Sequence, residues 1–148
     1  MDDLELRRET KKNKEASIDS FYINGRSLAD LIGEHDYVSP LGWLDIHPDH
    51  NFRAMLTLSQ ASDFRPERVP LLVCPECAAY DCSLITVRID RIEDTIVWSD
   101  FRWERDYDDC SKPPDAGVSL RFDFDLSSYM LALSQTNKGE QVMDVNRQ

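Results

Sequence analysis

The sequence contains no apolar run long enough to cross a membrane. A spanning helix needs about 20 consecutive, mostly apolar residues, and polar residues interrupt every apolar run of this 148-residue chain well before that length. The first 17 residues, MDDLELRRETKKNKEAS, also lack the apolar core of a signal peptide. We therefore expect a cytoplasmic protein that makes no contact with a membrane.

Basic residues are also scarce. The chain carries 17 Lys and Arg against 28 Asp and Glu, which gives a net charge of −11. Nucleic acids and anionic lipids are bound by clustered Lys and Arg, so this balance argues against both. An acidic surface instead attracts a basic protein and speeds its association. On charge alone, the simpler interpretation that the acidity only maintains solubility stays open.

A catalytic constellation is the third absence, and we predict that the chain is not an enzyme. His47 and His50 are interpreted as surface histidines of a polar loop rather than as a metal or acid–base site. A thioredoxin-like dithiol would lie at the start of a helix, whereas the chain after Cys77 runs into a predicted strand. Acidic surroundings would also raise the pKa of a nucleophilic thiol.

The cysteines allow one alternative function. Cys74, Cys77 and Cys82 form a C-x2-C-x4-C pattern on a tight turn, and structural zinc requires four N or S ligands. The fourth ligand would come from one of three residues: Cys110, His47 or His50. A strong zinc signal has two paired knuckles, and the second pair is missing. Since cytosolic thiols normally stay reduced, we predict no cofactor and keep a small zinc-binding structural or regulatory module as the alternative.

The length of the chain fits one domain with a single core. Residues 1–16 mix acids and bases evenly and contain no large apolar residue after Leu6. This composition predicts a flexible charged arm. We expect residues 17–136 to form a single globular α+β domain and residues 137–148 to form a polar tail.

The segment from Pro70 to Phe101 dominates the structural prediction. Residues 84–90, LITVRID, alternate as a strand, and residues 94–101, DTIVWSDF, resume the β pattern after a short charged turn. This spacing predicts an antiparallel hairpin, about 83–90 and 94–101. Four of its side chains should bury against a helix: Val87, Ile89, Ile96 and Trp98. The predicted class is α+β, an antiparallel sheet with this central hairpin packed by a few short helices.

Shorter elements are predicted around this hairpin. A strand from residue 17 ends at the turn-forming pair Asn24-Gly25, and a short helix follows from the N-cap Ser27 to Gly33. Residues 51–61 fit a helix or a strand equally well. The remaining predictions are an acidic irregular segment at 34–50, a buried strand at 71–73, a loop at 102–117, a strand at 118–125, and a helix that starts at Asp125 or Ser127.

The predicted loop after Phe101 holds the candidate binding residues. Its aromatic side chains lie among carboxylates, which suits a protein interface, whereas a nucleic-acid interface would place bases around them. A merely solvated acidic loop is the alternative. The candidate partner-binding residues are Trp103, Glu104, Asp106, Tyr107, Asp108 and Asp109, with Trp103 and Tyr107 as candidate hot spots.

Three segments of the chain carry a recognisable pattern: VPLLVCPEC at residues 69–77, ITVR at residues 85–88 and TIVWSDF at residues 95–101. Further matching positions are Gly42-Trp-Leu44, Cys82, Asp106-Tyr107, Phe122-Asp-Phe-Asp125 and Tyr129. The pattern resembles that of a family of small uncharacterised bacterial proteins over roughly residues 18–133. The chain departs from the family at Ala78 and Ala79, where its members usually carry Gly and Asp.

This resemblance implies a compact α+β domain in a bacterial cytoplasm and brings no established activity with it. Small acidic bacterial proteins without catalytic motifs are often the immunity partners of secreted toxins, including toxins of contact-dependent inhibition systems. Together with the charge, this class argument leads to a functional hypothesis. The chain is predicted to be an antitoxin-like immunity protein that binds and neutralises a cognate basic toxin domain, such as a nuclease.

Overall fold

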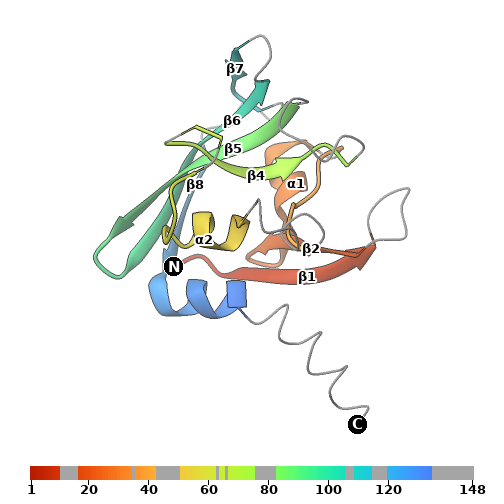
Figure 1. The fold of residues 1–148 in the computed structure, drawn as a ribbon. Coiled ribbons are helices and arrows are strands. Elements are labelled where there is room, and N and C mark those ends of the chain that lie inside the picture. Colours follow the sequence, from red (N-terminus) through yellow and green to blue (C-terminus); the bar gives the residue numbers. More distant parts are fainter. Residues whose placement is uncertain are drawn as a thin grey trace.

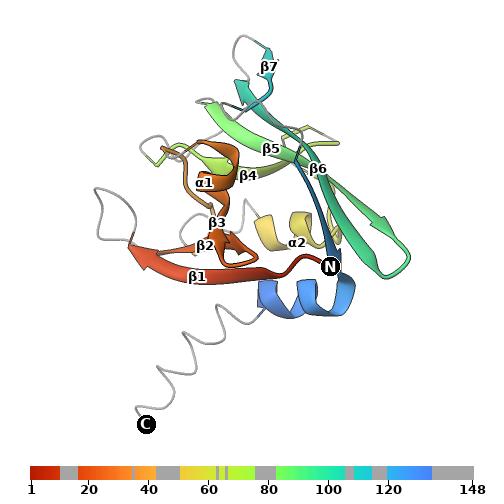
Figure 2. The same ribbon diagram turned by 180° about the vertical axis from the view of Figure 1, so that it is seen from behind.

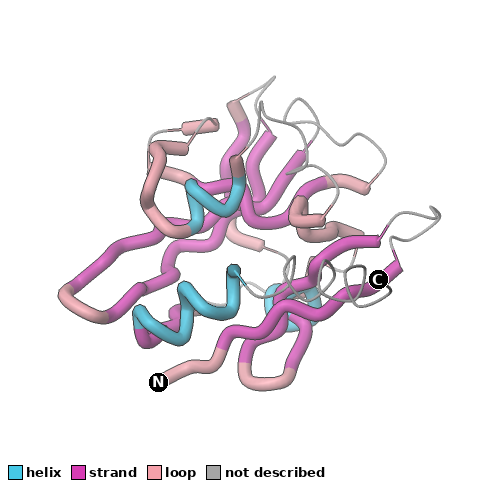
Figure 3. Tube along the Cα trace, turned by 60° about the horizontal axis from the view of Figure 1, so that its bottom comes forward, coloured by secondary structure: helices cyan, strands magenta, loops and turns pink. Residues whose placement is uncertain are grey.

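A computed structural model describes the following residues of the chain: 1–10, 17–34, 36–42, 51–62, 64–65, 67–75, 83–105, 109–114 and 120–134. Within these ranges the chain forms two antiparallel sheets and three short helices (Figure 1), which confirms the predicted α+β class. The helices are short segments set among the strands (Figure 3). None of the helices in the described ranges is long and apolar enough to span a bilayer.

The larger sheet is built around the predicted hairpin. Its strands are β4 (Val69–Val73), β5 (Ser83–Ile92), β6 (Thr95–Arg105), β7 (Cys110–Lys112) and β8 (Arg121–Asp125). Their order is β4-β5-β6-β7, and β8 pairs with the first half of β6, beyond the residues that β7 reaches. The turn between β5 and β6 lies between the paired residues Ile92 and Thr95. The hairpin prediction is confirmed, and both strands are longer than predicted.

The smaller sheet is a hairpin with a short third strand. It contains β1 (Leu4–Thr10), β2 (Ser17–Ile23) and β3 (Arg26–Ser27) in that order. β2 ends at the predicted turn, where Asn24 and Gly25 have φ angles of 54° and 83°. Positive φ angles at both central positions are the reason that Asn and Gly are favoured in such turns.

The flexible arm predicted for residues 1–16 is wrong for residues 4–10, which form β1. The whole of β1 pairs with β2, and Leu4 and Leu6 lie opposite Ile23 and Phe21. β1 itself has too few apolar residues to predict a strand. It is a stable strand because its two leucines complete an apolar face that β2 supplies.

Two bridges connect the N-terminal part of the chain to the larger sheet. Asp2 pairs with Phe124 of β8, and the backbone N–H of Asp2 donates to the Asp123 carbonyl at 2.8 Å. Val38 pairs with Val73 of β4 through hydrogen bonds of 2.9 and 2.7 Å. Between these bridges, α1 (Leu28–Ile32) lies close to both the smaller sheet and β4 in the two ribbon views (Figures 1 and 2).

The helices begin and end much as their sequences predict. α1 ends at Gly33, whose φ is 76°, but the Ser27 side chain makes no capping hydrogen bond. Residues 51–61, which fitted a helix or a strand, form α2 (Phe52–Leu56), and the Asn51 side chain accepts from the Ala54 N–H at 3.1 Å. The third helix covers residues 126–134, and Asp125 caps it by accepting from the Ser128 N–H at 3.1 Å.

The core between the two sheets is centred on Trp98. Its ring makes edge-on contacts with Phe21 of β2, Phe124 of β8 and Tyr129 of the third helix. The Trp98 Nε1–H donates to the Tyr129 hydroxyl at 3.1 Å, and this hydroxyl donates to the Leu56 carbonyl at 2.6 Å. All four hairpin side chains predicted to face a helix are buried: Val87, Ile89, Ile96 and Trp98.

The loop predicted for residues 102–117 is wrong at two places. β6 continues to Arg105, and β7 pairs with its last three residues. The extension begins after a bulge in which Asp100, with a φ of 54°, and Phe101 together lie opposite Val87. Charged and aromatic residues alternate here because Trp103 lies on the face of β6 that carries Trp98, whereas Arg102 and Glu104 lie on the opposite face. Residues 106–108 and 115–117 lie outside the described ranges.

Candidate functional site

Trp103, one predicted hot spot, lies on the face of β6 that also carries Trp98. Its ring is half-buried, and its Nε1–H donates to the Tyr37 hydroxyl at 2.8 Å. The Arg105 guanidinium lies 5.0 Å and the Lys112 ammonium 4.7 Å from the ring centroid. Trp103 is therefore held in one orientation by a hydrogen bond and two cation–π contacts, with part of its surface accessible.

Glu104, the neighbouring candidate, is not an accessible anchor. It is 3% exposed, and its carboxylate lies 3.2 Å from Arg65 Nε and 3.5 Å from Arg68 Nε. The Thr86 hydroxyl also donates to it. Asp109 is the opposite case, with a side chain that is 87% exposed and an ion pair of 3.1 Å to Arg65. The other three candidates, Asp106, Tyr107 and Asp108, lie outside the described residues.

The contacts of Glu104 belong to an arginine cluster, which we define as Arg65, Arg68, Thr86, Asp100 and Glu104. Arg68 lies at its centre: Nε donates to the Thr86 hydroxyl at 3.0 Å and Nη1 to the Asp100 carboxylate at 3.0 Å. Burial lowers the pKa of Arg68, while the carboxylates of Asp100 and Glu104 oppose that shift. The cluster extends to Asp109 through Arg65 and to Arg102, which lies 3.6 Å from Asp100. Each of its charged side chains has an oppositely charged neighbour, so the cluster is structural.

A second buried acid, Asp19, connects the smaller sheet to the helices. Its carboxylate pairs with Arg8 Nε at 2.9 Å and with Arg53 Nη2 at 3.0 Å. Arg53 on α2 also donates to the Leu133 carbonyl of the third helix. The chain passes close to this site at Gly42, where a Cβ atom would lie 3.1 Å from the Asp19 backbone nitrogen. Asp19 is therefore a structural residue as well.

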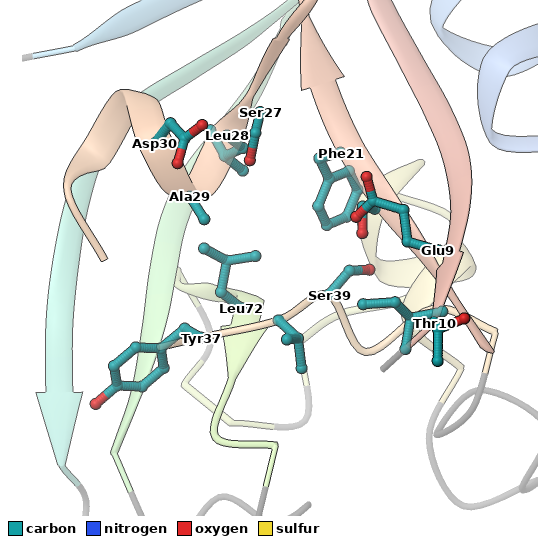
Figure 4. A pocket seen from close by; sticks show the side chains of 13 residues that line it. Glu9, Thr10, Phe21, Ser27, Leu28, Ala29, Asp30, Tyr37, Ser39 and Leu72 are labelled. Carbon is teal, nitrogen blue, oxygen red and sulfur yellow. The ribbon is translucent and has the colours of Figure 1, made fainter. Parts of the chain in front are cut away.

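A pocket of about 220 Å³ opens beside this core, between the β1–β2 hairpin, α1 and the segment around Val38. We call it the acidic pocket. Buried apolar side chains form part of its wall: Ile18, Phe21, Leu28 and Leu72. Its polar lining comes from Glu9, Thr10, Ser20, Ser27, Asp30, Tyr37 and Ser39. Figure 4 shows Glu9 and Asp30 on opposite sides of the space.

Two carboxylates, of Glu9 and Asp30, line the acidic pocket. The Tyr22 hydroxyl, next to the pocket, donates to Glu9. This hydrogen bond, together with burial and the charges of Glu9 and Asp30, raises the pKa of Tyr22. The Arg7 guanidinium lies 4.1 Å from the Tyr22 ring centroid and pairs with Glu5 at 3.1 Å. None of the described residues that line the pocket is Lys, Arg or His.

Tyr37 joins the acidic pocket to Trp103. Its ring lines the pocket while its hydroxyl points away from it (Figure 4), accepting from Trp103 and sharing a hydrogen bond with Ser83. The pocket, Tyr37 and Trp103 therefore form one continuous candidate site. The sequence contains no local signal for this site, since Glu9 belongs to the predicted arm and Asp30 to an ordinary short helix. The period-two placement of Leu4 and Leu6 is the one hint of the strand that carries Glu9.

The cysteine pattern is only partly within the described residues. Cys74 follows β4 and Cys110 begins β7, while Cys77, Cys82, His47 and His50 lie outside the described ranges. β5 and β6 separate β4 from β7, which places Cys110 about 14 Å from Cys74 across the sheet at about 4.8 Å per strand. One zinc ion therefore cannot join these two thiolates. Zinc analysis of protein purified without chelator tests the remaining ligand sets.

Metal ligation finds no further support in the described part of the chain, which contains no group of three or more His, Cys, Asp and Glu side chains arranged to hold an ion.

Comparisons with protein-family models, with curated proteins and with solved structures give no match to this chain. The arguments about function therefore rest on the geometry and the charges described above.

Proposed function

We propose that the chain is an acidic binding protein that neutralises a basic protein, as an immunity protein does with its toxin. The observation that supports this most strongly is where the charges lie. Asp19 and Glu104 each engage two arginines within the fold. Arg65 and Arg68 also pair with the exposed acids Asp109 and Asp100. The whole chain nevertheless carries a net charge of −11.

The proposed contact surface is the site that runs from Trp103 through Tyr37 to the acidic pocket. Protein interfaces concentrate their binding free energy in a few aromatic residues that pack in fixed orientations. Trp103 and Tyr37 are such residues because each orients the other through a hydrogen bond of 2.8 Å. Asp109, which is exposed near the same end of the larger sheet, contributes charge at the edge of this surface.

Charge complementarity makes a kinetic prediction for this function. Long-range attraction raises the association rate, and added salt screens it over a Debye length of about 8 Å at physiological ionic strength. Binding to the basic partner should therefore weaken steeply with salt, mainly through slower association. A partner whose affinity does not change between low and high salt would contradict the proposed role of the acidic surface.

Co-expression with the product of the adjacent gene tests the proposal in cells. We expect that product to be toxic alone and harmless together with this chain, and Trp103→Ala to reduce protection. Ile92→Ala removes an exposed apolar residue at the far end of the hairpin and is the matched control. Survival of cells that lack the 148-residue protein would reject the pairing with that gene product. Equal protection by both variants would reject the assigned surface.

A further inference from the structure

We propose that the chain associates with a second copy of itself through an apolar groove between α2 and the third helix. The two helices lie side by side in both ribbon views (Figures 1 and 2). The groove, which we call the helix groove, has a volume of about 760 Å³. Its described lining comes from these two helices: Arg53, Ala54, Thr57, Leu126, Ser127, Met130, Leu131, Leu133 and Ser134. The proposal does not depend on the function proposed above.

The helix groove is nearly free of charge in a strongly acidic chain. Residues 126–134 include no charged side chain, although 30% of the whole chain is charged. Arg53 is the one charged residue of the described lining, and its guanidinium pairs with the buried Asp19 and donates to the Leu133 carbonyl. Two copies that each carry a net charge of −11 repel each other wherever their acids meet. A neutral surface therefore suits a second copy, whereas a basic partner is steered to the acidic surfaces.

The shape of this surface fits a contact between identical copies. Leu131 lines the groove and is 55% exposed, and Leu58, next to the lining residue Thr57, is 42% exposed. Met130 is half-buried beside Leu131, and a methionine side chain adapts to the surface that it meets. In a two-fold symmetric interface the same patch serves both copies, so a projecting residue must fit a hollow of its own patch. Leu131 and the groove beside it meet this requirement.

The size and place of the groove predict a weak dimer that leaves the Trp103 surface accessible. A nine-residue helix is about 14 Å long, so the interface belongs to the small class below about 1,200 Å². We expect a dissociation constant of about 100 µM. β8, which leads into the third helix, pairs with residues 95–99 of β6, whereas β7 pairs with residues 103–105. One copy can therefore hold a second copy and the basic partner together.

Sedimentation velocity of the full chain, from about 1 µM to about 1 mM, measures this self-association. Leu131→Asp should weaken it more than about tenfold, because a carboxylate replaces the projecting apolar side chain. Ile92→Asp is the matched control: Ile92 is 58% exposed at the tip of the β5–β6 hairpin, outside the described lining, and the change adds the same charge. It should weaken the dimer less than about twofold. A monomeric wild type throughout this range, or equal weakening by both variants, would overturn the proposal.

Salt and a second variant separate apolar packing from ion pairing. Added salt screens the repulsion between two acidic copies, so the wild-type dimer should tighten about threefold at high salt. This is the opposite of the salt dependence expected for the basic partner. Leu131→Lys should weaken the dimer as strongly as Leu131→Asp. Tighter association of Leu131→Lys, or dissociation of the wild-type dimer by salt, would assign the contact to ion pairs and overturn the proposal.

Other occupants of the helix groove give different outcomes. Residues 135–148 follow the third helix and lie outside the described residues. If replacement of Val142, Met143 and Val145 by serine tightens the dimer more than about tenfold, the groove belongs to the chain's own C-terminal residues, which would also overturn the proposal. A monomeric wild type that still protects cells would reject the dimer and leave the proposed function intact. A dimer that protects against no gene product would do the reverse.

Discussion

Two sets of side chains in this protein each consist of one Asp, one Glu and one Tyr, but one set is buried and the other lies at or beside the pocket. The interior set consists of Asp19, Glu104 and Tyr129, and the pocket set consists of Glu9, Asp30 and Tyr22. Each interior carboxylate lies between two arginines, and the Tyr129 hydroxyl has a donor in Trp98 and an acceptor in Leu56. In the pocket set, Tyr22 donates to Glu9, and no described lining residue is basic.

This difference separates buried charge, which is compensated by arginines inside the fold, from charge at the more accessible pocket. A buried carboxylate is costly to desolvate, so its arginines are needed for folding, and removal of one member leaves an uncompensated charge. An accessible carboxylate keeps its hydration and contributes little to stability. Matched substitutions in the two sets should therefore affect stability in the interior and binding at the pocket.

The largest expected effect is that of Asp19→Asn, which leaves Arg8 and Arg53 without the charge that lies between them. Because Asp19 is fully buried, we expect the free energy of unfolding to fall by about 3 kcal/mol. The matched change Asp30→Asn should alter it by less than about 0.5 kcal/mol. Urea denaturation followed by tryptophan fluorescence measures both. Similar losses in the two variants would remove the distinction between the sets.

Glu104→Gln should have the next largest effect, about 2 kcal/mol. The loss is smaller than at Asp19 because the arginine nitrogens lie 3.2 and 3.5 Å from the Glu104 carboxylate, farther than the 2.9 and 3.0 Å at Asp19, so less attraction is lost. The matched pocket variant is Glu9→Gln, which keeps an oxygen for the Tyr22 hydroxyl and should stay close to wild-type stability. A stable Glu104→Gln protein that loses partner binding would return Glu104 to the interface.

Tyr129→Phe should cost about 1.5 kcal/mol because the Leu56 carbonyl and the Trp98 N–H lose their partner. Burial raises the pKa of Tyr129 above that of the unfolded chain, so its stabilisation is present below about pH 10 and is lost as the pH rises toward the folded pKa. Above pH 10, the free energy of unfolding of the variant should therefore fall less steeply with pH than that of the wild type. Tyr22→Phe, at the accessible pocket, is the control. Identical alkaline unfolding curves for wild type and Tyr129→Phe would contradict the sign of this argument.

Asp109→Asn should produce the smallest change in stability, below about 0.5 kcal/mol, because its ion pair with Arg65 is exposed. Its effect should instead appear in slower association with the partner at low salt. Stopped-flow mixing at two salt concentrations measures it. A larger loss of stability than in Glu104→Gln would mean that the outer ion pair, rather than the inner one, holds the arginine cluster together.

Local patterns predicted the parts of the fold whose partners lie nearby in the chain. The alternation of residues 84–90 and 94–101 indicated the hairpin because its two strands are joined by a short turn. Gly33 and Asp125 marked helix ends by their own conformation or hydrogen bonding. Long-range pairing was missed: β1 lacks an apolar pattern of its own, and the extension of β6 depends on β7 beyond residues 106–108.

The predicted interface shows the same limit. Glu104 was grouped with Asp106, Asp108 and Asp109 because all four acids lie in one charged segment. Nothing in the local sequence indicated that Glu104 alone would be buried. Its burial depends on Arg65 and Arg68, which come from a segment almost 40 residues earlier. Trp103 kept its predicted accessibility only in part, since Tyr37 is needed to orient it. The acidic pocket could not be predicted, because its lining is assembled from five separate segments between Glu9 and Leu72.

The sequence by itself determined the α+β class, the central hairpin and the surplus of acid, because periodicity and net charge are local or additive properties. Only the tertiary structure decided which acids are buried and paired with arginines. Asp19 and Glu104 are matched by arginines from distant segments, whereas Glu9 and Asp30 lie on opposite sides of a pocket whose described lining residues include no base. Desolvation and ion pairing depend on distances in space, and spacing along the chain does not contain them.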